Sequence, residues 1–120
     1  MASILIVDDE EPLRTLLRRV LEEDGHTVRE AANGSAALAL YREHPTDLVI
    51  TDILMPKRDG LDVLLALTRE FLEVKVIAMT GASGDHQLLQ VAKLLGARKV
   101  VKKPFTIEEI RSLIRTTLEQ

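Results

Sequence analysis

Four short hydrophobic runs in the sequence each end in polar residues that are suited to metal or phosphoryl chemistry. These residues are Asp8 and Asp9 after residues 4–7, Asp52 after residues 48–51, Thr80 after residues 76–79, and Lys103 after residues 100–102. Carboxylates bind hard cations, and hydroxyl and ammonium groups stabilise phosphoryl oxygens. If the runs are parallel strands, their carboxyl ends meet at one edge of a sheet. The residue types therefore predict a magnesium-assisted phosphoryl-transfer site.

The charges of these groups also favour a bound cation. Two carboxylates about 4 Å apart repel each other by roughly 4 kcal/mol at an effective dielectric constant near 20. The three carboxylates carry more negative charge than the single ammonium of Lys103 can neutralise, and a divalent ion would remove the excess. Oxygen ligands at a partly open site favour Mg²⁺ over Ca²⁺, and Mn²⁺ can take its place.

The position of each group suggests its role. Asp52 stands alone at the end of a central run, and a carboxylate can accept a phosphoryl group as an aspartyl phosphate. Asp9, Asp52 and one loop carbonyl would hold the metal, with Asp8 acting through water. Lys103 would neutralise the phosphoryl oxygens, and the Thr80 hydroxyl would donate a hydrogen bond to another of them.

The hydrophobic runs alternate with segments of helical periodicity. Helices are expected at about residues 12–24, 34–44, 61–71, 84–95 and 107–118, with a further strand at 27–31. Glu10 and Glu11 suit the positive end of the first helix dipole, and Thr106 with Glu109 forms a capping box for the last helix. The order βαβαβαβαβα predicts an open, doubly wound parallel sheet with helices on both faces.

The composition supports one compact domain over residues 1–120. The chain has 120 residues, 46% of them hydrophobic, and no cysteine that could form a disulfide. It begins without a basic segment or a long apolar run, so we expect a cytoplasmic protein without membrane association. A net charge of −3 and few aromatic residues argue against direct nucleic-acid binding.

The motifs at the strand ends resemble those of response regulator receiver domains, the CheY-like domains of two-component signal transduction. The matching motifs are Val7-Asp8-Asp9, Asp52 followed by Met55-Pro56 and Asp59-Gly60, Thr80, Gly96-Ala97 and Lys103-Pro104-Phe105. They extend over nearly the whole chain. The resemblance implies a single-domain, flavodoxin-like (βα)5 fold of three α/β/α layers with strand order 2-1-3-4-5. It also implies phosphoryl transfer to Asp52 from a histidine kinase or a histidine phosphotransfer protein, in a two-component system or phosphorelay.

The resemblance further implies a metal site made by Asp9, Asp52 and the backbone carbonyl of Leu54, and a cis peptide bond between Lys103 and Pro104. A downstream target protein would read the surface of the fourth helix, the fifth strand and the fifth helix, where the expected switch residues are Val100, Pro104 and Phe105. The domain would catalyse only its own phosphorylation and slow dephosphorylation, so it is not expected to be an enzyme. A monomer and a weak dimer both stay open.

The sequence departs from the family pattern at three positions. Val100 stands where the family usually has Tyr or Phe, so a switch based on an aromatic rotamer is absent. We therefore predict signalling through the backbone and through shifts of the fourth helix. Leu54 and Ala82 are apolar and cannot orient an attacking water, which predicts slow self-dephosphorylation.

Other functions are possible for the same residues. A Mg²⁺-dependent phosphohydrolase with an aspartyl-phosphate intermediate usually needs a second acid two residues after the nucleophile, where this sequence has Leu54. A flavin-binding module would place the cofactor phosphate against Asp8 and Asp9. A receiver-like interaction module that works without phosphorylation would not need the complete polar set. The apolar residues at 88–95 fit either a buried helix or an exposed strip for partners or dimerisation.

Overall fold

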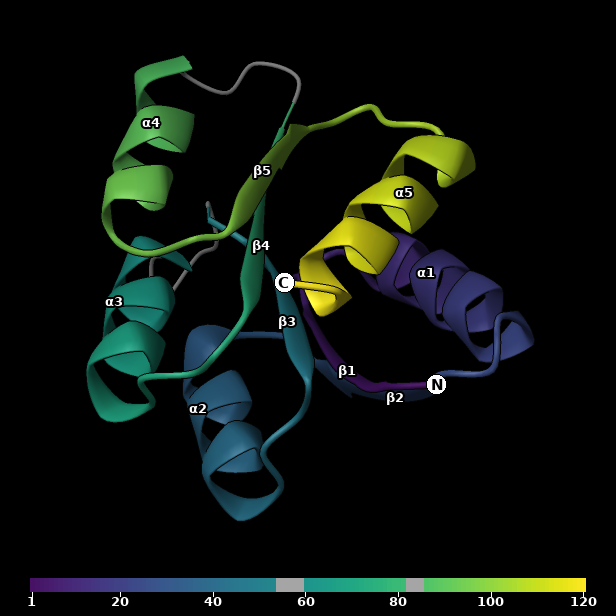
Figure 1. The fold of residues 1–120 in the computed structure, drawn as a ribbon, viewed down its shortest axis with the longest axis horizontal. Coiled ribbons are helices and arrows are strands. Elements are labelled where there is room, and N and C mark those ends of the chain that lie inside the picture. Colours follow the sequence, from purple (N-terminus) through teal and green to yellow (C-terminus); the bar gives the residue numbers. More distant parts are fainter. Residues whose placement is uncertain (54–59, 82–85) are drawn as a thin grey trace.

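The computed structural model describes residues 1–53, 60–81 and 86–120, in which strands and helices alternate along the chain (Figure 1). The elements are β1 (Ser3–Val7), α1 (Glu11–Glu23), β2 (Thr27–Ala31), α2 (Gly34–Glu43), β3 (Leu48–Asp52), α3 (Gly60–Glu70), β4 (Val76–Thr80), α4 (His86–Leu94), β5 (Lys99–Lys102) and α5 (Ile107–Leu118). This alternation confirms the predicted element order. The expected start of α4 at Gly84 lies outside the described residues.

The strands form one parallel sheet in the order β2-β1-β3-β4-β5. Helices α1 and α5 cover one face of the sheet, and α2, α3 and α4 cover the other (Figure 1). The predicted doubly wound, flavodoxin-like architecture with strand order 2-1-3-4-5 is therefore confirmed. The register aligns the carboxyl ends of the strands, because Val7 pairs with Thr51, and Thr80 pairs with Lys102.

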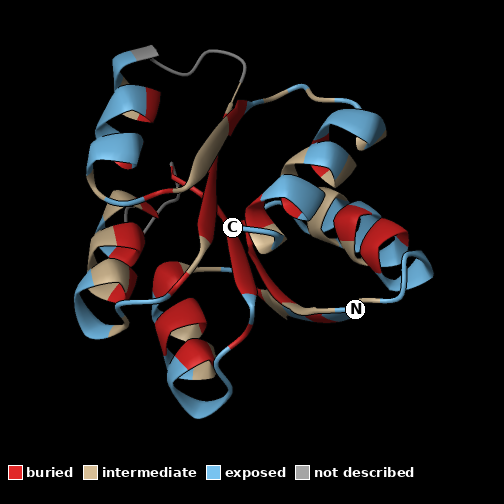
Figure 2. Ribbon diagram, in the orientation of Figure 1, coloured by how far each residue is buried: buried red, intermediate tan, exposed pale blue. Residues whose placement is uncertain are grey.

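Alternate residues of the central strands enter two apolar clusters, one on each face of the sheet. In β1, Leu5 and Val7 pack on the side of α2, α3 and α4, while Ile4 and Ile6 pack on the side of α1 and α5. Every residue of β3 and β4 is buried (Figure 2). Burial on both faces explains why these strands are continuous apolar runs in the sequence.

The helix ends follow the local signals in the sequence. Pro12 lies in the first turn of α1, and Gly25 follows the helix with φ of 93°, a left-handed conformation that favours glycine. The predicted capping box of α5 is confirmed, since the Thr106 side chain accepts from the backbone N–H of Glu109 and the Glu109 side chain accepts from that of Thr106.

Residues 88–95 were expected to form either a buried helix or an exposed apolar strip, and α4 has features of both. Leu89 and Ala92 are buried against the sheet, whereas Val91 is 40% exposed and Leu94 is 86% exposed. The helix therefore has a core face and an exposed apolar strip. None of the described helices combines the length and apolar composition that a bilayer-spanning helix needs.

Candidate functional site

Three of the predicted site residues lie at or just beyond the ends of β1, β3 and β5, where the sheet hydrogen bonds continue into the loops. Asp52 is the last residue of β3, and its neighbour Ile53 donates its backbone N–H to Met79 O at 2.9 Å. The backbone N–H of Lys103 donates to Thr80 O at 2.8 Å, and that of Asp8 donates to a carbonyl of β2 at 3.1 Å. The site backbone is therefore an extension of the sheet.

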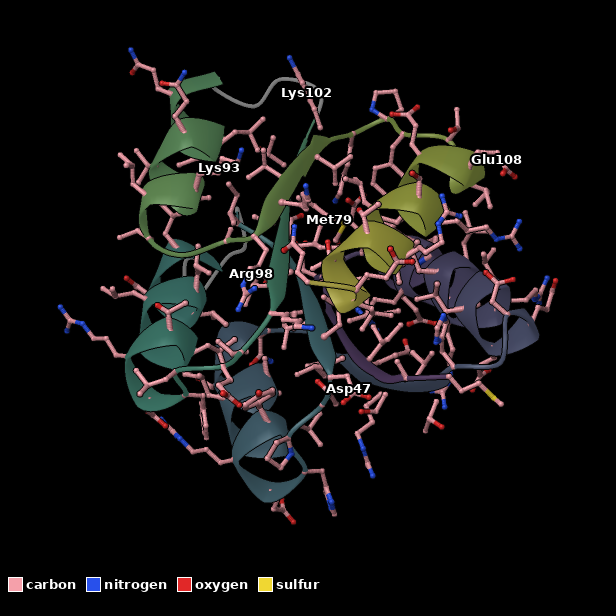
Figure 3. All side chains as sticks on the ribbon, in the orientation of Figure 1. Asp47, Met79, Lys93, Arg98, Lys102 and Glu108 are labelled. Atoms are coloured by element: carbon pink, nitrogen blue, oxygen red, sulfur yellow. The ribbon has the colours of Figure 1, made fainter. Side chains whose placement is uncertain are left out.

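The side chain of Lys103 is the centre of the site. Its Nζ lies 2.9 Å from Asp8 Oδ2, 2.9 Å from Asp52 Oδ2 and 3.1 Å from Glu10 Oε1. A lysine ammonium has three N–H donors, and here each donates to a different carboxylate. The neighbouring Lys102 extends outward from the end of β5 (Figure 3) and is exposed. Lys103 is thus the lysine that enters the site.

Asp8 is held on all sides at the end of β1. The residue is fully buried, and its Oδ1 accepts the backbone N–H of Glu10 at 2.8 Å. The Arg14 guanidinium donates to the Asp8 carbonyl at 2.7 Å and forms an ion pair with Glu30 at 3.2 Å. The first turn of α1 therefore fixes both the backbone and the carboxylate of Asp8.

Burial and ion pairing shift the pKa values of this pair. Burial raises the pKa of the Asp8 carboxyl, and the hydrogen bonds from Lys103 and from the Glu10 backbone oppose this shift only in part. Burial alone would lower the pKa of Lys103, but its hydrogen bonds to Asp8 and Asp52 outweigh that effect, so the pKa lies well above its ordinary value. Lys103 is a permanent cation at this end of the sheet.

Thr80 supplies a hydroxyl group that the fold does not use. The residue is fully buried at the end of β4, and within the described part of the chain its Oγ1 atom has no hydrogen-bond partner. A buried hydroxyl without a partner costs free energy, and most buried polar atoms are paired. Such an atom is available to a ligand that reaches the site.

Glu10 joins the site although the sequence analysis placed it only at the helix dipole. One oxygen each of Asp8, Glu10 and Asp52 lie within 4.8 Å of one another, close enough to share a metal ion. The intervening Asp9 is exposed and does not belong to this group within the described residues. Asp9 lies at a bend between β1 and α1, and Glu10 reaches the site from the N-cap of α1. The acidic run at residues 8–11 was the available signal in the sequence.

Of the predicted metal set, the structure brings Asp8 and Asp52 together. The exposed Asp9 is outside that group, and Leu54 lies outside the described residues, as does Ala82. The metal-binding roles of Asp9 and Leu54 stay predictions.

Gly60 explains how α3 can begin directly against the end of β3. A Cβ atom on Gly60 would overlap the Asp52 carbonyl oxygen and Ile53 Cα, and it would lie 2.8 Å from the Ile53 carbonyl carbon. Real Cβ atoms do not approach backbone atoms this closely, so only glycine fits. The position of Asp52 thus depends on the lack of a side chain at residue 60.

The expected switch residues lie on β5 and the loop that follows it. Val100 is half-buried and packs against the cluster on the α2, α3 and α4 side, while Phe105 is half-buried against the cluster on the other side. Pro104 is exposed, and the Lys103–Pro104 peptide bond is cis, as the family resemblance implies. These residues connect Lys103 with both layers of helices.

Comparison with known proteins gives one consistent family. The family model of the response regulator receiver domain matches residues 4–115. Sporulation initiation phosphotransferase F of Bacillus subtilis is 38% identical over 97% of this chain and 93% of its own length. Chemotaxis protein CheY of Halobacterium salinarum is 36% identical over 97% of this chain and 96% of its own length.

Solved structures agree with the sequence matches. A response regulator receiver domain protein from Clostridium thermocellum has a TM-score of 0.93 at 31% identity and covers 99% of this chain and 95% of its own. The response regulator TrrA from Thermotoga maritima, solved in complex with Mg²⁺ and BeF, has a TM-score of 0.87 at 32% identity and covers 98% and 99%. The sheet order, the strand-end residues and the match over residues 4–115 show that the chain belongs to the response regulator receiver family, the phosphoacceptor domains of two-component signal transduction.

Proposed function

We propose that Asp52 is the phosphoryl acceptor of this receiver domain and that Lys103 and Thr80 contact the transferred group. The main support is the position of the Lys103 ammonium, which bonds the buried Asp52 carboxylate at 2.9 Å and is itself only 14% exposed. A permanent cation at the acceptor oxygen can stabilise charge on an incoming phosphoryl group. The donor would be a phosphohistidine of a histidine kinase or a histidine phosphotransfer protein.

The transfer needs little covalent chemistry from the protein. An Asp52 oxygen forms the new P–O bond while the P–N bond to the donor imidazole breaks, and the bonding electron pair stays on the imidazole nitrogen. Lys103 neutralises charge on the phosphoryl oxygens. The unpartnered Thr80 hydroxyl donates a hydrogen bond to one of these oxygens, which would satisfy a group that has no partner in the described part of the chain.

The donor set at this end of the sheet fits Mg²⁺. One carboxylate oxygen each of Asp8, Glu10 and Asp52 lie within 4.8 Å of one another, and a hard divalent cation would neutralise their charge. We assign Asp9, Asp52 and the Leu54 carbonyl as ligands, with Asp8 acting through water, and Mn²⁺ as a substitute. When bound, the metal would neutralise the carboxylates and the phosphoryl oxygens.

A downstream target protein would bind the face made by α4, β5 and α5. This face carries the exposed Val91 and Leu94 of α4, and a depression of about 620 Å³ beside β5 lined in part by Val100, Lys102 and Leu113. Because Val100 has no ring that can change rotamer, phosphorylation would alter this face through the backbone and α4. The apolar Leu54 and Ala82 support slow loss of the phosphoryl group, so the domain would act only on itself.

Phosphorylation by a small donor tests these assignments. The protein is incubated with Mg²⁺ and acetyl phosphate, and intact-protein mass spectrometry is expected to show one added phosphoryl group. Asp52→Asn should abolish the addition, and a chelator should prevent it. Asp47→Asn, a matched change at an exposed aspartate on the opposite end of the sheet, should not affect it. Turnover of diverse phosphate esters would favour a phosphohydrolase, and absence of any addition would favour an interaction module.

A further inference from the structure

Glu10 is the one carboxylate bound to Lys103 in the described structure for which the phosphoryl-transfer scheme has no role. Its Oε1 lies 3.1 Å from Lys103 Nζ, close to the 2.9 Å of the bonds from Asp8 and Asp52. The Glu10 side chain is 62% exposed, whereas those of Asp8 and Asp52 are 0% and 6% exposed. Glu10 is thus the solvated member of a trio whose other two members are buried.

The three bonds leave Lys103 without a free donor. Its ammonium has three N–H groups, and each has a carboxylate partner. A phosphoryl oxygen on Asp52 can bind Lys103 only if one of these partners is displaced. The requirement follows from the donor count alone.

Glu10 is the partner that can be displaced most easily. Asp8 is fully buried and its second oxygen is held by the Glu10 backbone N–H, so moving it would leave a buried charge unpaired. Asp52 stays beside Lys103 in this scheme, because it carries the phosphoryl group itself. The Glu10 carboxylate can return to water with little loss, because an exposed ion pair contributes little free energy.

We propose that Glu10 is a positioning residue that holds the third N–H of Lys103 in the unphosphorylated domain and gives it up to an oxygen of the phosphoryl group. The inference rests on the proposed role of Asp52 as acceptor. While bound, Glu10 keeps the ammonium directed between Asp8 and Asp52, and it competes with the incoming anion. The Glu10 contact therefore sets how readily the site accepts a phosphoryl group.

The proposal makes opposite predictions for cations and anions. The Glu10 carboxylate adds negative charge beside the cluster of carboxylates, which favours Mg²⁺, and it occupies the donor that an anion needs. Loss of the carboxylate should therefore weaken Mg²⁺ binding and strengthen binding of a phosphoryl analogue. A general loss of folding would weaken both.

Fluoroberyllate, which bonds to an aspartate oxygen in the geometry of a phosphoryl group, serves as the probe. Its affinity is measured by ¹⁹F NMR at saturating Mg²⁺, and the affinity for Mg²⁺ alone by calorimetry. Glu10→Gln is expected to bind fluoroberyllate about fivefold more tightly and Mg²⁺ about twofold more weakly, the changes that correspond to one exposed ion pair.

Two variants separate the contact from the charge. Glu10→Asp keeps the charge but is one methylene too short to hold Lys103, so it should match Glu10→Gln with fluoroberyllate and the unmodified protein with Mg²⁺. Glu11→Gln removes a charge from the next position, which is exposed and has no bond to Lys103 in the described structure, and it should change fluoroberyllate affinity less than about twofold. The ¹⁵N signal of Lys103 Nζ should move in both Glu10 variants and not in Glu11→Gln.

The possible failures are distinct. Glu10→Asp that equals the unmodified protein with fluoroberyllate, or equal effects of Glu10→Gln and Glu11→Gln, would overturn the role of Glu10. Failure of the unmodified protein to bind fluoroberyllate with Mg²⁺, or unchanged binding by Asp52→Asn, would instead overturn Asp52 as acceptor.

Discussion

The charged side chains at the two ends of the parallel sheet have different kinds of partners. At the carboxyl end, Lys103 is mostly buried and meets three carboxylates. At the amino end, Lys75 Nζ donates to the neutral carbonyl of Leu118 at 3.1 Å, and Asp47 accepts the backbone N–H of Ser3 at 2.9 Å. The amino end also has a depression of about 850 Å³ that is lined in part by Asp47, Lys75 and Leu118.

This difference shows that converging charge, rather than the size of a hollow, identifies the site. At the amino end the charged side chains of Lys75 and Asp47 have backbone partners, so these charges serve the fold. At the carboxyl end, like charges are brought together in a buried place, which destabilises the fold unless a cation neutralises them. The repulsion between buried carboxylates lies at the carboxyl end of the sheet, where a bound metal ion would relieve it and a phosphoryl group would be held.

Exchange of the lysine at each end should give the largest contrast. Lys103→Met is expected to lower the free energy of unfolding by about 4 kcal/mol in a chelator, because it leaves buried carboxylates unpaired. Mg²⁺ should restore most of this loss. Lys75→Met should cost about 1 kcal/mol and show no response to Mg²⁺. Urea unfolding with and without Mg²⁺ measures both, and a loss in Lys103→Met that ignores Mg²⁺ would contradict the comparison.

Glycine substitutions at the two ends of the sheet should give the second-largest contrast. Gly60→Ala is expected to cost about 3 kcal/mol and to impair phosphorylation, because the new Cβ would meet the backbone of Asp52. Gly96→Ala lies at the amino end with φ of +115° and would meet only the Thr68 side chain, so about 1–2 kcal/mol is expected, with phosphorylation intact.

Gly81→Ala is the control for the glycine pair, since no atom of the described structure outside Gly81 and its two chain neighbours lies within 4 Å of the place that its added methyl group would take. Thermal unfolding and phosphorylation with acetyl phosphate are measured on all three variants. Normal phosphorylation of folded Gly60→Ala would show that the backbone of Asp52 tolerates displacement.

Two buried threonines give a smaller contrast of opposite sign. The Thr80 hydroxyl has no partner in the described structure, so Thr80→Val is expected to leave stability unchanged or raise it by about 1 kcal/mol while slowing phosphorylation. Thr117 donates its hydroxyl to Leu113 O at 2.6 Å, so Thr117→Val should lower stability by about 1 kcal/mol without affecting phosphorylation. Denaturant unfolding distinguishes the two, and a clear loss of stability in Thr80→Val would mean that its hydroxyl serves the fold.

The smallest effect is expected in the pH dependence of Glu30. The hydrogen bond from Arg18 lowers the pKa of this carboxyl below its ordinary value. Its stabilising effect is therefore present above about pH 4.5, the ordinary value, and is lost as the pH falls through the lower folded pKa. Unfolding at pH 7 and pH 3 should show Glu30→Gln less stable by under about 1 kcal/mol at pH 7 only. A gap that persists at pH 3 would assign the effect to packing.

The pH dependence of the Asp8 contribution to stability is opposite in sign to that of Glu30. Burial raises its pKa, so the contribution of Asp8 is most favourable at low pH and is lost as the pH rises through the folded value. The contributions of Glu30 and Asp8 to the free energy of unfolding thus change with pH in opposite directions.

The sequence was sufficient to predict the sheet and most of the site backbone. Continuous apolar runs and alternating helical segments determine a parallel sheet, and the sheet brings the ends of its strands together, so Asp52, Thr80 and Lys103 could be placed from position alone. The face of each loop residue could not be predicted in this way. Whether Asp9 or Glu10 reaches Lys103 depends on side-chain direction in the few residues after β1, where no strand periodicity operates.

Contacts between elements also could not be predicted from the sequence. Gly60 was noted only as part of a motif of the family resemblance, and the need for glycine arises from the backbone of Asp52, which lies in β3. The missing partner of Thr80 within the described residues is likewise a property of the packed structure.

The sheet ladder that continues past the strand ends has a consequence for local opening of the domain. The amides of Asp8, Ile53 and Lys103 are each bonded to the neighbouring strand or its extension. Their hydrogen exchange should therefore be governed by the same cooperative opening as the centre of the sheet, and not by fraying of loops. A domain that keeps its central strands formed therefore also keeps in place the backbone that carries Asp8, Asp52 and Lys103.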